Sequence, residues 1–212
     1  MPRLLLATTN PGKIHELRVL LDGCGWQIVT PADLGITIDV EEDGETYHDN
    51  ARKKALAGMH ASGLVTLADD SGIEIDALGG GPGVRSARYV RPDATYDERF
   101  AEIEQYLDGR TPTERAARFV AVIAIADPRS GEVRFAEGSI SGVISPEPRG
   151  ENGFGYDPVF WSPSQSATTA ELAGHEKAII SHRARAIAGA RQILLELLHD
   201  HQDPDLTYSR AG

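Results

Sequence analysis

Asp69 and Asp70 directly follow residues 64–68, which are apolar or β-branched without polar alternation. That pattern predicts a strand buried on both faces, and Ser71 with Gly72 favours a turn at its end. Successive strand residues point to opposite faces, so the carboxylates could share a ligand only if the backbone turns between them. We expect one carboxylate in a cleft and the other bonded to nearby backbone. Such a pair could hold a divalent cation or act as a general base, or it could merely cap a loop.

A polar loop near the N-terminus could bind a phosphate. Residues 3–8 predict a strand, and a helix is expected to open at Lys13, with Ile14, Leu17 and Leu21 on one face. The loop between them would present free backbone N–H groups, the positive end of the helix dipole and the Lys13 ammonium. The alternative is an ordinary capped loop between a strand and a helix, because no Walker pattern is present.

An acidic segment, residues 41–45, precedes a predicted helix over residues 46–61. Such a run can be a solvated loop, or its acids can complement the helix dipole. If it folds over the end of the Asp70 strand, one of its carboxylates becomes a second metal ligand. Lys54 of that helix could point into the same cleft, although it could equally lie on the surface.

Two later segments carry further candidates. Residues 149–158 hold three glycines around Phe154 and Tyr156, which could offer a flat surface for a base or simply fill the core. A long helix is predicted over residues 176–199; Lys177 and Ser181 can share one of its faces, and Arg183 lies within a turn of them. The alternative is that these are ordinary solvated residues on the first turns of the helix.

Composition limits the function classes. The chain has 212 residues and a formal net charge of −11, which makes a long nucleic acid an unlikely partner. Its single cysteine excludes an internal disulfide. The N-terminal apolar run is too short for a signal peptide, and residues 119–126 predict a strand and no membrane span. We therefore expect a cytoplasmic protein with no nucleic-acid partner and no membrane association.

The order of the predicted elements indicates an α/β fold. We expect a mixed central sheet flanked by helices, with two long strands over residues 116–126 and 132–145 extending beyond it as an antiparallel β lobe. The substrate cleft would lie between the two lobes. We expect residues 1–200 to form a single two-lobed domain and residues 201–212 a polar tail.

Four separated patterns resemble the inosine triphosphate pyrophosphatase family. They are Ala7-Thr8-Thr9-Asn10-Pro11-Gly12-Lys13, Asp69-Asp70-Ser71-Gly72 with Leu78-Gly79-Gly80, Gly153-Phe154-Gly155-Tyr156-Asp157-Pro158, and Ser181-His182-Arg183. The resemblance covers residues 3 to about 198. It implies hydrolysis of deaminated purine nucleoside triphosphates (ITP, dITP and XTP) to the monophosphate and pyrophosphate, with Mg²⁺ as cofactor, in a homodimer. Thr9, where some members have glycine, and Ala178, where asparagine is common, depart from the family pattern.

The resemblance also implies residue roles. Asp70 would be the general base and a magnesium ligand, and Glu41 a further ligand, with the choice of Glu41 over Glu42 left open. Lys177, His182 and Arg183 would hold phosphate or base, and on separate chemical grounds a buried donor such as the Arg183 guanidinium would pair with the 6-oxo group of the base, which adenine lacks. The substrate-binding residues would be Thr8, Thr9, Asn10, Pro11, Gly12, Lys13, Lys54, Ser71, Phe154, Gly155, Tyr156, Asp157, Lys177, His182 and Arg183.

Two other functions remain open at this stage. One is a related pyrophosphatase that acts on modified pyrimidine nucleotides, and the other is a regulatory module that binds a nucleotide without turning it over.

Overall fold

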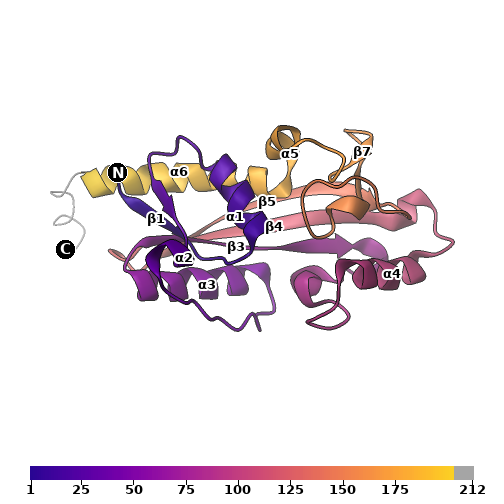
Figure 1. Ribbon diagram of the computed structural model, residues 1–212, viewed down its shortest axis with the longest axis horizontal. Helices are drawn as coiled ribbons and strands as arrows, with labels where there is room; N and C mark the ends of the chain where they lie inside the picture. The colour runs from indigo at the N-terminus through magenta and orange to yellow at the C-terminus, as the bar shows by residue number, and fades with distance from the viewer. Residues whose placement is uncertain (203–212) are drawn as a thin grey trace.

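The fold is built on one open, mixed sheet. The computed structural model describes residues 1–202, with side chains to Asp200. The strand order is β2-β1-β3-β4-β5-β6-β7, in which β1 is parallel to β2 and β3 and the remaining neighbours are antiparallel. The expected mixed sheet flanked by helices is confirmed (Figure 1). The strands are β1 (Arg3–Leu6), β2 (Gln27–Val29), β3 (Val65–Ile75), β4 (Ala116–Ala126), β5 (Val133–Ile144), β6 (Phe160–Ser162) and β7 (Ala167–Thr168).

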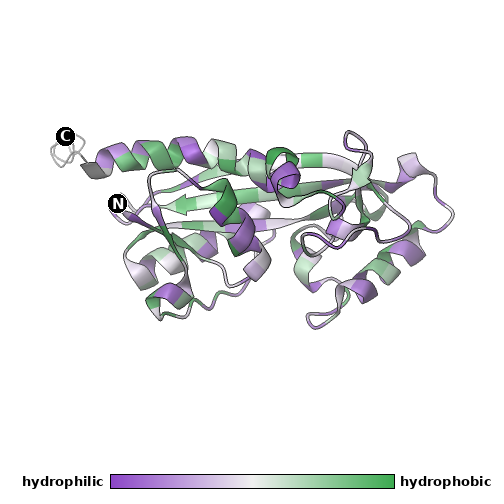
Figure 2. Cartoon of the chain, turned by 45° about the horizontal axis from the view of Figure 1, so that its top comes forward, coloured by the Kyte–Doolittle hydropathy of each residue, from purple (hydrophilic) through white to green (hydrophobic). Residues whose placement is uncertain are grey.

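Helices cover both faces of the sheet (Figure 1). Apolar residues of α1 and α6 form one core with β1, β3, β4 and β5, whereas α3 packs on the opposite face. A third core joins α4 to the distal halves of the long strands. In Figure 2, α6 shows alternating hydrophobic and hydrophilic bands along its length, as expected of a helix that buries one face. The helices are α1 (Pro11–Leu20), α2 (Pro31–Leu34), α3 (Tyr47–Ser62), α4 (Tyr96–Leu107), α5 (Gly174–Ile180) and α6 (His182–Gln202), and the short 3-10 helices are η1 (Asp76–Leu78), η2 (Gly83–Arg88), η3 (Pro112–Arg115) and η4 (Asp157–Val159).

Strand β3 does not end at the acidic pair, so the expected turn at Ser71 and Gly72 is wrong. The strand continues to Ile75, and β4 pairs with it along its length, with Asp69 opposite Ile123 and Asp70 opposite Val122. The long apolar β4 supplies ladder partners that the local sequence of β3 cannot reveal. The two carboxylates therefore lie within the strand and point to opposite faces of the sheet.

The antiparallel part of the fold is a continuation of the same sheet. Strand β1 pairs only with the first residues of β3, the last register pair being Leu6 with Leu67, and β2 pairs with β1 on the other side. Beyond Leu67, the sheet consists of β3, the hairpin of β4 and β5, and the short strands β6 and β7, and α4 packs on this part of it (Figure 1). The distal half is thus helix-covered antiparallel sheet.

The helix expected over residues 176–199 is two helices. Helix α5 ends at Ile180, and the backbone of the next residue, Ser181, is extended at φ −64° and ψ 157°. The Ser181 hydroxyl then accepts a hydrogen bond from the Ala184 N–H and caps α6. The chain changes direction at this break, which lies between Lys177 and Arg183, and both of these side chains are buried.

The C-terminal segment was expected to be a tail from residue 201. Helix α6 continues to Gln202, with His199 exposed on it, and residues 203–212 lie outside the described residues. Within residues 1–202, no helix combines the length and apolar character needed to cross a membrane.

Candidate active site

The loop between β1 and α1 leads directly into the N-terminus of that helix. Asn10 caps α1 by accepting a hydrogen bond from the Lys13 N–H at 3.1 Å, and Pro11 occupies the first turn. The Thr8 hydroxyl accepts from the Asn10 N–H at 3.2 Å, and Thr9 is exposed beside it. The predicted loop geometry is therefore present, with Pro11 at the helix start instead of Lys13.

Asp69 faces α1 and α6 and lies in a cluster of cations. Its carboxylate contacts the Lys13 Nζ at 2.6 Å and the Arg183 Nε at 2.8 Å, and the Ser71 hydroxyl donates to it at 2.8 Å. Burial alone would raise the pKa of Asp69, but Arg183 and Lys13 hold it well below the usual range. The expectation of backbone partners for the second carboxylate is wrong, because its partners are side chains. Asp69 is a charged anchor that orients Lys13 and Arg183.

Asp70 points to the opposite face, toward α3. Its Oδ1 contacts the Lys54 Nζ at 2.7 Å, and the Asn50 amide approaches its Oδ2 at 3.4 Å. Burial raises the pKa of Asp70 above that of an ordinary aspartate, although the Lys54 ammonium opposes this. A raised pKa makes this carboxylate a better acceptor for a proton near neutral pH.

A pocket of about 340 Å³, the carboxylate pocket, opens over Asp70. Lys54 points into it, as one reading of the sequence predicted, and its Nζ also donates to the Asp69 carbonyl at 2.8 Å. The wall opposite α3 is the loop before α1. The site residues that line this pocket are Thr8, Thr9, Asn10, Lys13, Glu42, Lys54, Asp70 and Ser71.

The structure brings Glu42 into this pocket, whereas Glu41 is exposed outside its lining. The Glu42 Oε1 contacts the Lys54 Nζ at 2.9 Å, and Arg88 of η2 donates to the Glu42 carbonyl at 2.6 Å. Burial would raise the pKa of Glu42, but Lys54 lowers it below the usual value. The geometry therefore favours Glu42 over Glu41 as a partner of Asp70.

Two carboxylates converging on one ammonium suit a divalent cation. Among the residues that the structure describes, no group of three or more His, Cys, Asp or Glu side chains is arranged for a metal. Mg²⁺ commonly takes one or two protein carboxylates and fills its remaining positions with water and substrate phosphate. Asp70 and Glu42 fit that donor set.

A second, narrower pocket, the Phe154 pocket, adjoins the first. Asn10, Lys13 and Ser71 line both, so the two pockets meet along these residues. The Phe154 ring lies 5.4 Å from the Lys177 Nζ and 5.5 Å from the guanidinium carbon of Arg183. The further predicted residues that line this pocket are Gly155, Tyr156, Asp157, Lys177, His182 and Arg183.

The loop carrying Phe154 is held by a buried carboxylate. Asp157 accepts hydrogen bonds from the Phe154 N–H and the Thr169 hydroxyl, both at 2.8 Å, and pairs with Lys177. Gly12 approaches so closely that an added Cβ would lie 2.4 Å from the Phe154 ring. Tyr156 is a buried core residue whose hydroxyl donates to the Ser86 carbonyl, so of the two aromatics Phe154 is the one with accessible surface.

His182 and Arg183 are buried at the start of α6. Arg183 donates to Asp69, Glu16 and, at 2.9 Å, the Ser71 hydroxyl, which fixes its guanidinium plane. His182 stacks on Phe119 with centroids 4.7 Å apart, and burial holds its pKa well below 6.5. Both residues line the Phe154 pocket, as the sequence predicted.

Three residues of this site were not anticipated. Glu16 of α1 pairs with both Lys177 and Arg183; it follows Lys13 by three residues, so a shared helix face could have indicated it. Tyr96 at the start of α4 lines the Phe154 pocket and meets Tyr156 edge to face. Arg88 holds the acidic segment, and no local pattern signals that contact.

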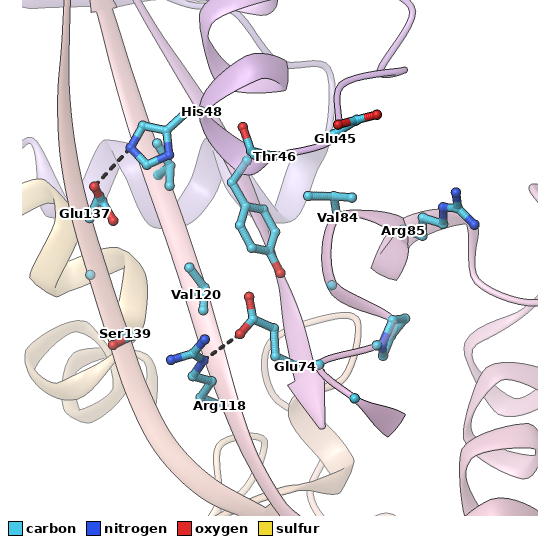
Figure 3. Close-up of a pocket in the computed structure, with 18 of the residues that line it drawn as sticks. Glu45, Thr46, His48, Glu74, Val84, Arg85, Arg118, Val120, Glu137 and Ser139 are labelled. Carbon is cyan, nitrogen blue, oxygen red and sulfur yellow. Dashed lines mark hydrogen bonds and ion pairs between the residues drawn. The ribbon is translucent and has the colours of Figure 1, made fainter. Parts of the chain in front are cut away.

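A larger pocket, of about 880 Å³, lies elsewhere, between α3, η2 and the outer face of β4 and β5 (Figure 3). None of the predicted site residues lines it. Four of its ionisable side chains already have partners within the protein, in the contacts of His48 with Glu137 at 2.9 Å and of Arg118 with Glu74 (Figure 3). The two smaller pockets suit a polyanion that carries an aromatic group better, because they combine several cationic side chains with the Phe154 ring.

Fold and site together define a class: an open α/β protein with a cation-lined cleft suited to a nucleotide. The chain belongs to the Ham1 family, whose family model matches residues 4–193. The expected family resemblance is thereby confirmed.

Curated relatives and solved structures agree with this assignment. The chain is 47% identical to the dITP/XTP pyrophosphatase of Desulforamulus reducens, over 95% of this chain and 99% of that protein, and 46% identical to that of Thermus thermophilus, over 95% and 94%. Among solved structures, a HAM1 protein from Coxiella burnetii superposes with a TM-score of 0.82 at 38% identity, covering 92% of this chain and all of that one. The Ham1 protein of Staphylococcus aureus gives 0.80 at 36% identity, covering 91% and 97%.

Proposed function

We propose that this protein hydrolyses the deaminated purine nucleoside triphosphates ITP, dITP and XTP to the nucleoside monophosphate and pyrophosphate, and so keeps these bases out of DNA and RNA. Membership of the Ham1 family supports the reaction, because the curated relatives are named dITP/XTP pyrophosphatases. The observation that carries the proposal is the junction of the two pockets through Asn10, Lys13 and Ser71. A triphosphate in the carboxylate pocket would place its base against Phe154.

Asp70 is the proposed general base for attack of water on the α-phosphorus. Its raised pKa and its position at the carboxylate pocket suit proton transfer from a bound water. Lys13, Lys54 and the N-terminal amides of α1 would stabilise charge on the phosphate oxygens. Lys177 lies by Phe154 and Asp157, so we assign it to the base side of the substrate.

Mg²⁺ is the proposed cofactor, and Asp70 with Glu42 are its proposed protein ligands. When bound, it would neutralise phosphate charge and orient the leaving pyrophosphate. Glu42 replaces Glu41 in this proposal because only Glu42 lines the pocket.

Selectivity for a 6-oxo base would come from donors fixed in the Phe154 pocket. Arg183 is held by Asp69, Glu16 and Ser71, so its guanidinium is preorganised beside the Phe154 ring. A fixed donor forms a hydrogen bond with the 6-oxygen of hypoxanthine or xanthine. In adenine the same donor faces the 6-amino group, which is also a donor, so neither group has a partner. We further propose, on the family resemblance, that the protein acts as a homodimer in the cytoplasm.

A substrate panel tests the proposal. The purified protein with Mg²⁺ is given ITP, XTP, dITP, GTP, ATP or dUTP in separate reactions, and pyrophosphate and orthophosphate are measured separately. We expect pyrophosphate from ITP, dITP and XTP far above GTP and ATP. Preferential turnover of dUTP would favour a pyrimidine enzyme, orthophosphate would move the attack to the γ-phosphorus, and a stable ITP complex without turnover would indicate a binding module.

A further inference from the structure

We propose that Lys54 occupies the place of the divalent cation while none is bound, and that it thereby couples cation binding to triphosphate binding. The inference rests on the proposed function, which makes Asp70 and Glu42 the cation ligands. It assigns Lys54 a second role, beyond contact with phosphate: its ammonium changes partners between carboxylates and substrate.

The Lys54 ammonium is fully engaged by oxygen atoms. Its Nζ donates to the Asp70 Oδ1 at 2.7 Å, to the Asp69 carbonyl at 2.8 Å and to the Glu42 Oε1 at 2.9 Å. An ammonium has three donors, so these bonds use all of them. Its side chain is only 11% exposed, and it is the nearest cation to both carboxylates; Glu42 has a second ion pair, with the Arg88 Nη1 at 3.6 Å from its Oε2.

A cation at the same carboxylates would compete directly with this lysine. Magnesium approaches its oxygen ligands to about 2.0–2.1 Å, closer than the ammonium lies now, and two positive charges on one pair of carboxylates repel each other. Lys54 must therefore release Asp70 and Glu42 for them to coordinate a cation. The backbone of α3 is fixed at this point by buried Ala51 and Ala55, so only the flexible stem of Lys54 can move.

The triphosphate would provide the released ammonium with new partners. The carboxylate pocket extends from Lys54 to the N-terminus of α1, where phosphate oxygens are proposed to bind. Without a triphosphate, a displaced Lys54 would lose two carboxylates and gain nothing but water at a largely buried position. Each ligand thus favours the other, which is a coupling free energy between two binding events.

Adjacent lysines provide a matched comparison. Lys53 precedes Lys54 on α3, is exposed and pairs only with Asp43 among the contacts of the described residues. Lys53→Met removes the same charge from the same helix without touching the carboxylate pocket. Lys54→Met removes the competing ammonium but keeps a side chain of similar length.

The test is the affinity for Mn²⁺, measured by electron paramagnetic resonance or calorimetry in the absence of nucleotide. We expect Lys54→Met to bind Mn²⁺ at least about tenfold more tightly than the wild type, while Lys53→Met stays within about twofold of it. A non-hydrolysable α,β-methylene analogue of ITP should tighten Mn²⁺ binding more in the wild type than in Lys54→Met. Unchanged or weaker Mn²⁺ binding by Lys54→Met would overturn the proposal.

Two further measurements separate the possible failures. Asp70→Asn should abolish Mn²⁺ binding; if it does not, the cation binds elsewhere and the role of Lys54 is refuted. If a variant at position 54 is too unstable for titration, the thermal midpoint of Lys54→Gln should rise more with Mn²⁺ than that of the wild type, because the cation restores neutralisation of the two carboxylates. An equal or smaller rise would contradict the proposal. The substrate panel is independent of these results, so absence of turnover would refute the enzymatic function alone.

Discussion

Glu16 of α1 is the shared partner of two buried cations. The Glu16→Gln substitution therefore tests how much its two ion pairs contribute to the stability of the site. The Glu16 Oε1 contacts the Lys177 Nζ at 2.6 Å, and its Oε2 pairs with Arg183. The exposed side-chain fractions are 16% for Glu16, 7% for Lys177 and 2% for Arg183. Glutamine keeps the shape of the side chain but removes the negative charge.

The cost follows from what the two cations retain. Breaking a buried ion pair typically costs about 3–5 kcal/mol, because the remaining charge is left uncompensated. Here Lys177 keeps Asp157 and Arg183 keeps Asp69, which places the loss at the lower end, about 3 kcal/mol. For a chain of this size, that corresponds to a fall in the thermal midpoint of about 6 to 12 °C.

The assay is thermal unfolding followed by circular dichroism, with Glu196→Gln as the matched control. Glu196 pairs with Arg134 at 2.7 Å on the surface of α6, where ion pairs contribute little, so its variant should keep a nearly unchanged midpoint. We also expect Glu16→Gln to raise KM for ITP, because Arg183 and Lys177 flank Phe154. Equal midpoints for the two variants would refute the view that Glu16 holds the cations of this site.

Three further substitutions test separate parts of the account. His182 is neutral in the folded protein because its pKa is well below 6.5, so below pH 6.5 only the unfolded chain gains a proton at this residue. The free energy of unfolding should therefore fall by up to about 1.4 kcal/mol for each pH unit below 6.5. Urea unfolding at pH 5.5–7.5 should show a smaller dependence on pH in His182→Gln than in the wild type. Tyr96→Ala should widen the Phe154 pocket and lower the ITP/GTP ratio of kcat/KM by about fivefold or more, whereas an unchanged ratio would show that Tyr96 does not contribute to substrate selectivity. Gly12→Ala should displace the Phe154 ring and raise KM for ITP with little change in kcat; an unchanged KM would show that the ring position does not matter.

The loops of this site could be predicted from the sequence because their signals are local. Asn10 with Pro11 interrupts the strand pattern where α1 begins, and the two carboxylates come directly after a run of apolar or β-branched residues in β3. The length of β3 could not be predicted, since its continuation to Ile75 depends on ladder bonds to β4, about fifty residues later in the chain.

The same limit applies to the ion pairs. The Glu16 contacts with Lys177 and Arg183 join residues 161 and 167 positions apart, and only tertiary packing brings them together. The choice between Glu41 and Glu42 depends on which neighbour turns toward Lys54, a property of the folded loop. The break at Ser181 was hidden because the helical apolar periodicity runs through it.

The central claim is that Asp70, placed by β3 over the carboxylate pocket, takes the proton from the attacking water. The most direct test is the rate of pyrophosphate release from ITP by Asp70→Asn, compared with Asp76→Asn, which changes an exposed aspartate just beyond β3. The account predicts that Asp70→Asn stays folded at the assay temperature and loses at least about 10²- to 10⁴-fold in turnover, while Asp76→Asn retains the wild-type rate. Turnover by folded Asp70→Asn within a few-fold of the wild type would contradict it.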